Sequence, residues 1–210
     1  MELESSVRSR GRHLVGLAIV VAMWWIAFHH HDRIPVLTYV NLGIHEFGHF
    51  VTYAFSDLFT ALMGSVAQVG APLALSAYFL VRRGDWLASA LCLAWAATSA
   101  LEVAVYVADA PYEELQLIGG QHDWAFILGP DGFDAIGKAA SVADSIRDAA
   151  LLTMVGAVAL CLAGCAREPD YETEEASTSF ATPDSSALAA SATSGSAPRS
   201  ASSPQYTPPS

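Results

Sequence analysis

Long uncharged stretches separated by short polar ones set the strongest limit on how this chain can fold. Of its 210 residues, 53% are hydrophobic and 15% are charged, and the apolar residues gather in runs. The runs cover residues 14–28, 36–55, 58–81, 86–108 and 149–166. A helix needs about 20 apolar residues to cross a bilayer, so these lengths are typical of membrane spans. The sequence therefore predicts an all-α, polytopic membrane helix bundle of about five spans over residues 14–166, with the lipid bilayer as its partner.

The two ends of the chain differ from this apolar middle. Residues 1–13 are polar and basic, and the run that follows ends in Trp24 and Trp25 without a small-residue cleavage site. We interpret it as an uncleaved first span with the N-terminus inside, in a bacterial inner (plasma) membrane. Residues 167–210 are rich in Ser, Ala, Thr and Pro, which is typical of a disordered tail. The net charge of −11 argues against nucleic acid as a partner.

The second apolar run contains the sequence His45-Glu46-Phe47-Gly48-His49, an HExxH motif. On a helix, positions i and i+4 share a face, so both imidazoles can reach one ion. Glu46 lies beside the first histidine, where it can take a proton from a water molecule activated by that ion. Zinc metallopeptidases use this arrangement, so the motif predicts a Zn²⁺ site.

The polar residues of this run share one side of a helix. They are spaced 3, 4, 4, 3 and 4 residues apart: Thr38, Asn41, His45, His49, Thr52 and Ser56. Lipid cannot satisfy such a stripe, so we expect it to face protein or a wet cavity. We expect Asn41, and Gln68 from the next run, to line the site. The alternative is a seam that only joins helices through hydrogen bonds.

The motif supplies two ligands, whereas a catalytic zinc usually has three and an open position for water. His122 is the first choice for the third, because it lies in a polar break where the backbone can bend toward the membrane. Asp123 is the second choice, as a ligand or as the carboxylate that orients a ligand histidine. Asp109, Glu102 and Asp131 follow, Glu102 because a carboxylate within a span must face the bundle interior. An interfacial anchor is the alternative for His122 and Asp123.

The segment over residues 109–148 interrupts the apolar runs with acidic residues and glycines. Its apolar stretches are too short to span a bilayer, which predicts a re-entrant or interfacial segment. Within it, helical spacing of apolar residues over 133–146 predicts an amphipathic helix at the membrane surface, leading into the last span.

With these features the chain resembles the integral-membrane zinc metallopeptidases of the site-2 protease (M50-type) family. The resemblance is carried by His45-Glu46-Phe47-Gly48-His49 within an apolar helix. Gly129-Pro130-Asp131-Gly132 partly matches the family's Asn-Pro…Asp-Gly motif, which supplies an aspartate as third ligand. The resemblance implies a Zn²⁺ cofactor and a membrane-protein or peptide substrate. The chain has no PDZ-like insertion, and it looks like a small, divergent relative.

Motif and location together predict a zinc-dependent membrane-embedded hydrolase, most simply a peptidase, with Glu46 as the general base. Two other classes of protein fit the same residues. The histidines can belong to a non-catalytic metal-binding or transport protein, or the polar stripe can be the seam of a structural helix bundle.

Overall fold

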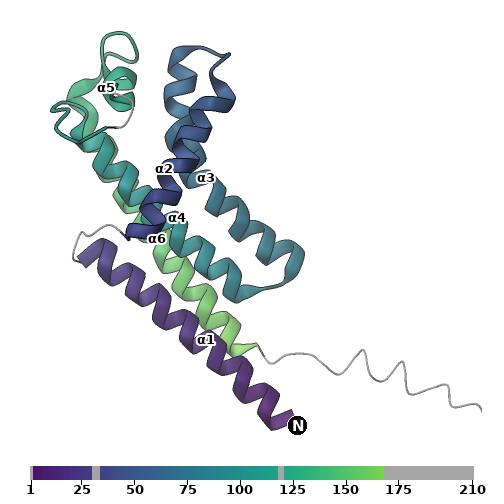
Figure 1. Cartoon of the computed structure of the whole chain (residues 1–210). Coiled ribbons are helices and arrows are strands. Elements are labelled where there is room, and N and C mark those ends of the chain that lie inside the picture. Colours follow the sequence, from purple (N-terminus) through teal and green to yellow (C-terminus); the bar gives the residue numbers. More distant parts are fainter. Residues whose placement is uncertain (1, 30–33, 118–120, 168–210) are drawn as a thin grey trace, which may run out of the picture. The chain divides into compact units, whose positions relative to one another are not determined.

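The structure, a computed structural model, describes residues 2–29, 34–117 and 121–167, with side chains from residue 11 onward except at position 35. These residues form helices and no strands, so the predicted all-α class is confirmed. In chain order the elements are α1 (Glu2–Trp24), the π-helical turn η1 (Trp25–His29), α2 (Pro35–Thr52), α3 (Asp57–Arg83), α4 (Trp86–Asp109), α5 (Asp123–Leu128), the 3₁₀ turn η2 (Ile136–Lys138) and α6 (Ala139–Ala166) (Figure 1). The predicted disordered tail, from residue 168 onward, lies outside the described residues.

Four described helical segments are long and apolar enough to cross a membrane: Gly11–His29, α3, α4 and Ile136–Ala166. Helix α2, which carries the HExxH motif, is not among them. Its 18 residues include four polar ones that lower its mean hydropathy: Asn41, His45, Glu46 and His49. The described residues thus contain four candidate spans beside the approximate five of the prediction, and α2 is a helix of 18 residues next to them.

Helices α2 and α3 form a hairpin in which the backbones lie very close (Figure 1). Ser56 caps the start of α3 by accepting a hydrogen bond from the Phe59 amide at 3.4 Å. A side chain at Gly48 of α2 would collide with the backbone carbonyl of Met63 on α3. Glycine at position 48 therefore allows the two helices to approach this closely.

The polar stripe of α2 faces the other helices, as its spacing predicts. Asn41, His45 and Thr52 are buried, whereas Phe47 and Phe50 on the opposite side are 60% and 70% exposed. Aromatic and aliphatic side chains that no protein covers are suited to lipid. Helix α2 thus turns its polar side inward and its apolar side outward.

Helix α4 lies at the centre of the bundle, between α3 and α6. Small residues allow these helices to approach closely. One cluster joins Ala90, Ala94 and Ala97 of α4 to Met154, Ala157 and Cys161 of α6 and to Val20 of α1. A second cluster joins Val103 and Val107 of α4 to Trp124 and Ile127 of α5. This second cluster places α5 against the bundle.

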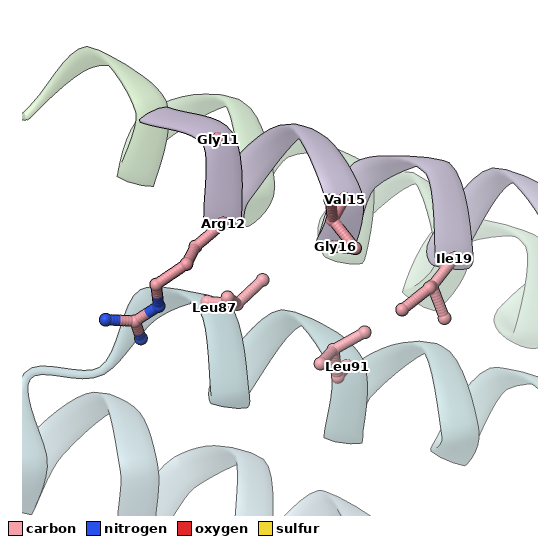
Figure 2. A pocket seen from close by; sticks show the side chains of 7 residues that line it. All are labelled: Gly11, Arg12, Val15, Gly16, Ile19, Leu87 and Leu91. Atoms are coloured by element: carbon pink, nitrogen blue, oxygen red, sulfur yellow. The ribbon is translucent and has the colours of Figure 1, made fainter. Parts of the chain in front are cut away.

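A shallow groove of about 330 Å³ lies between α1 and α4 (Figure 2). Its lining is apolar apart from one guanidinium and consists of Gly11, Arg12, Val15, Gly16, Ile19, Leu87 and Leu91. A Cβ atom at Gly16 of α1 would collide with the Leu87 side chain of α4, so the two helices approach closely at this position. None of the predicted site residues lines this groove.

The segment over residues 109–148 differs in part from its prediction. A short loop, α5 and η2 connect α4 to α6, as expected for a region that interrupts the spans. However, α6 is one helix from Ala139 to Ala166. From Ala139 onward, the predicted surface helix and the last span therefore form one continuous helix. No glycine or proline interrupts it before Gly156.

Candidate metal centre

Three side chains that could hold a metal ion converge between α2 and the start of α5. The Nε2 atoms of His45 and His49 lie 2.9 Å and 3.2 Å from Oδ2 of Asp123, the first residue of α5. Ligand atoms around a tetrahedral zinc are about 3.4 Å apart, given metal–ligand bonds of about 2.1 Å. The Asp123 oxygen therefore needs to move away from each nitrogen by only a few tenths of an ångström to match such a geometry. His45 is buried, and His49 and Asp123 are partly buried.

The other ring nitrogen of each histidine makes a contact that fixes its proton. His49 Nδ1 lies 2.8 Å from the carbonyl oxygen of Thr60, which can only accept a hydrogen bond, so Nδ1 carries the proton. His45 Nδ1 lies 3.2 Å from Oε1 of Gln68. In the neutral rings, both Nε2 lone pairs therefore point at the Asp123 carboxylate. A positive charge, either a metal ion or a proton on a ring nitrogen, makes such contacts favourable, and metal-binding histidines are oriented in this way.

Gly64 of α3 leaves the space into which the two imidazoles turn. A Cβ atom at this position would lie 2.6 Å from Nε2 of His45 and 2.6 Å from Nε2 of His49. These separations are far inside van der Waals contact. Position 64 therefore has to be glycine for both rings to point at Asp123.

His122, the first choice for the third ligand, does not belong to this group. Its Nδ1 caps α5 by accepting a hydrogen bond from the Ala125 amide at 3.2 Å, and this fixes the ring away from the two histidines. Its Nε2 lies 3.3 Å from Oδ2 of Asp109 but, within the described residues, makes no hydrogen bond. Asp123, the second choice, takes the place expected for His122 because the N-terminal turn of α5 points its side chain toward α2.

Two other predicted candidates lie elsewhere. The Asp109 carboxylate accepts hydrogen bonds from the amides of Glu114 and Leu115, at 3.2 Å and 3.0 Å, and so shapes the loop that follows α4. Asp131 is exposed in the turn after α5. The aspartate of the Gly-Pro-Asp-Gly sequence is therefore not the one near the histidines.

Glu102 of α4 accepts hydrogen bonds from three neutral donors and is not a member of the metal-holding group. They are Thr38 Oγ1 at 2.6 Å, Asn41 Nδ2 at 2.7 Å and Gln68 Nε2 at 3.3 Å. A carboxylate only accepts, so it turns the amide nitrogen of Gln68 toward itself and leaves Oε1 for His45. Asn41 also accepts from Trp95 and Ser99, at 2.7 Å and 3.0 Å. Asn41 and Gln68, predicted to line the site, therefore link α2 and α3 to α4 behind it.

Replacing Glu102 by alanine is expected to destabilise the bundle. Three interhelical hydrogen bonds at about 0.6 kcal/mol each give a loss of about 2 kcal/mol. Unfolding of the purified protein in mixed micelles measures this loss. Glu114→Ala removes an exposed acid and is expected to leave stability unchanged. Equal stability of the two variants would contradict the supporting role of Glu102.

Glu46 and the three converging side chains line one large cavity. The cavity has a volume of about 1090 Å³ and is lined by α2, α4, the loop after α4 and part of α6. His45, Glu46, His49 and Asp123 all reach it, and Glu46 itself is exposed. A general base has to share a solvent-accessible space with the reacting water and the substrate. The position of Glu46 meets this requirement.

Sequence reasoning missed three contributors to the site: Thr60, Gly64 and Tyr106. Thr60 acts through its backbone carbonyl, which no side-chain pattern reveals. Gly64 is one of several glycines in apolar runs, and the sequence does not show which of them faces the histidines. Tyr106, whose hydroxyl contacts Asp123, lies one helical turn after Glu102 on α4, and this spacing was the available signal.

Comparison of the chain with protein families, with curated proteins and with solved structures gives no match. The class of protein is therefore defined by its own features: an α-helical chain whose described residues include four candidate membrane spans and a His-His-Asp group that could hold a metal ion.

Proposed function

We propose that this chain is a zinc-dependent hydrolase embedded in a membrane, a bacterial inner membrane by our interpretation, and that it cleaves peptide bonds. The observation that supports this most is the convergence of His45 Nε2, His49 Nε2 and Asp123 Oδ2, with both Nδ1 atoms held by acceptors. Two imidazoles and a carboxylate are a common ligand set of catalytic zinc sites, and they leave one position open.

Each residue of the motif has a defined task in this proposal. His45, His49 and Asp123 hold the ion, which supplies Lewis-acid chemistry and makes water a better nucleophile at neutral pH. Glu46 takes a proton as the nucleophile attacks the carbonyl carbon and passes it to the leaving amine. The cavity of about 1090 Å³ offers room for a peptide segment beside these groups.

The resemblance to site-2 proteases supports the choice of a peptidase over other hydrolases. It rests on the HExxH motif in an apolar run and on an aspartate as third ligand. Asp123 is the aspartate that lies beside the two histidines. Asp131, in the Gly-Pro-Asp-Gly sequence, is exposed and does not belong to that group. The proposal therefore keeps an aspartate as the third ligand, as in that family, but assigns this role to Asp123 and not to Asp131.

The metal content of the purified protein tests the ligand set. We expect about one zinc per chain in the wild type, and a loss of most of it in His45→Ala and in Asp123→Asn. Asp131→Asn is the matched control, because it removes a carboxylate of the same type eight positions further along and should retain the metal. Elemental analysis after detergent purification gives the result. Zinc retained in Asp123→Asn but lost in Asp131→Asn would overturn the assignment.

A structural helix bundle is the second candidate, and one observation favours it. A hydrogen-bonded network joins α2, α3 and α4 without any metal. Its members are Thr38, Asn41, Gln68, Trp95, Ser99 and Glu102. If the wild type binds no metal at purification or after incubation with Zn²⁺, this network is the main role of the polar stripe.

A further inference from the structure

We propose that Tyr106 of α4 is the residue that positions Asp123 for metal binding. This inference rests on the proposed metal site and adds a fourth residue to it. Tyr106 neither reaches the ion nor belongs to the HExxH motif. It acts through Asp123, and its role is to bring the third ligand to the two histidines in the correct orientation.

The Tyr106 hydroxyl contacts both the backbone and the side chain of Asp123. It accepts a hydrogen bond from the Asp123 amide at 3.0 Å and donates one to Asp123 Oδ2 at 3.3 Å. One hydroxyl thus restrains both the Cα position and the direction of the carboxylate. Within the described part of the chain, the Asp123 carboxylate contacts the two imidazoles and accepts a hydrogen bond from Tyr106.

Asp123 needs such a restraint because its own segment is short. Helix α5 has six residues, and a helix of this length does not hold itself together without tertiary contacts. Trp124 anchors it to α3 by donating to Ser65 Oγ at 3.0 Å. That bond, with the apolar cluster around it, fixes the helix body but leaves the Asp123 side chain free to rotate.

The ring of Tyr106 is itself held in place. It stacks on His122 at a centroid distance of 4.2 Å and meets the edge of His45 at 6.0 Å. Both neighbours belong to elements that form the site. The hydroxyl is therefore carried by a candidate span, and ring contacts with His45 of α2 and His122 hold it in place.

Removal of the hydroxyl has two opposing effects on metal affinity. Losing a donor makes the carboxylate more basic, which strengthens metal binding, but the bond to Oδ2 is long, at 3.3 Å, so this effect is small. Losing the restraint on the Asp123 amide lets the ligand move, and outer partners of metal ligands commonly contribute roughly 10- to 100-fold in affinity. We therefore expect weaker binding.

Tyr106→Phe tests the proposal, since it keeps the ring and removes only the hydroxyl. The matched control is Tyr112→Phe, at an exposed tyrosine shortly after α4. Full-length proteins are purified in detergent, stripped of metal and titrated with Zn²⁺, and a second series is loaded with Co²⁺ for visible spectroscopy. We expect roughly 10-fold weaker Zn²⁺ binding and an altered Co²⁺ spectrum for Tyr106→Phe, and wild-type behaviour for Tyr112→Phe.

The possible outcomes separate this inference from the proposed function. Unchanged affinity and an unchanged Co²⁺ spectrum in Tyr106→Phe would overturn the positioning role while the metal site stands. Weaker binding with an unchanged spectrum and a lower unfolding temperature of the metal-free protein would also overturn it, in favour of a purely structural role. A wild type that binds neither ion would remove the proposed function and the inference together.

A second variant keeps the test decisive if Tyr106→Phe does not fold. A difluorinated tyrosine at position 106 retains the shape of the side chain and makes its hydroxyl a weaker acceptor. We expect the Co²⁺ spectrum of this protein to shift from that of the wild type. An identical spectrum would count against the role of Tyr106.

Discussion

Glu46→Gln is expected to retain the metal and to lose at least 100-fold in peptide hydrolysis. Glu46 is exposed to the cavity and lies outside the group that could hold the ion, so an amide of the same shape leaves the ligands in place. A positioned general base contributes about 10²- to 10⁴-fold to the rate, and glutamine cannot take up the proton. The measurement combines elemental analysis with a proteomic count of new peptide ends in cells that carry either protein.

Glu114→Gln is the matched control for this experiment, because it removes an exposed carboxylate from the loop after α4. We expect it to match the wild type in both metal content and new peptide ends. If Glu46→Gln also matches the wild type in peptide ends while His45→Ala abolishes a cellular phenotype, the chain is a non-catalytic metal-binding or transport protein. Loss of metal in Glu46→Gln would instead place this carboxylate among the ligands.

Gly64→Ala is expected to weaken metal binding by at least 100-fold without unfolding the bundle. The added methyl group would lie 2.6 Å from Nε2 of both histidines, so both rings must rotate away from Asp123. These are the ends of side chains, which can move while the backbone stays. Alanine is also the better helix former, by about 1 kcal/mol. We expect at least 100-fold weaker Zn²⁺ binding in the titration described for Tyr106, with unchanged helical content by circular dichroism.

Gly70→Ala on the same helix provides the comparison, since a Cβ atom there meets nothing within 4 Å. It carries the same gain in helix propensity and should bind Zn²⁺ like the wild type. The two variants therefore separate the steric effect at the site from a general effect of alanine in α3. Wild-type affinity in Gly64→Ala would show that the imidazoles do not meet beside this glycine.

The HExxH helix could be predicted from the sequence because its features repeat with a regular period. The spacing of Asn41, His45 and Thr52 places them on one side of a helix, and the structure buries that side. The same polar residues also lower the hydropathy of α2, which is why it is not among the four candidate spans of the described residues.

The third ligand could not be chosen from the sequence because His122 and Asp123 are adjacent and both suit a metal. Which of them points at α2 depends on where α5 begins. His122 becomes the cap of that helix, and its ring nitrogen is used by the Ala125 amide. A one-residue difference in the start of a six-residue helix therefore decides which side chain meets His45 and His49, and sequence patterns do not locate helix ends that precisely.

Glu102 illustrates a different limit. Its depth in a span indicated that it needs partners, and this expectation is met by Thr38, Asn41 and Gln68. Whether the partner is a metal or a set of neutral donors depends on which helix lies opposite. That arrangement is a tertiary property, and residue type alone does not encode it.

The hydrogen bonds of Glu102 also have a consequence for biogenesis. Thr38 and Asn41 of α2 donate to a residue 64 and 61 positions later in the chain, and Asp123 follows later still. Helix α3 supplies partners to His45 and His49 of α2 as soon as it is made, but Thr38 and Asn41 have to wait for Glu102 until α4 has left the ribosome. The pocket for the ion is complete only after Asp123 has been synthesised, so loading of the metal is expected to be a late step that follows translation of the bundle.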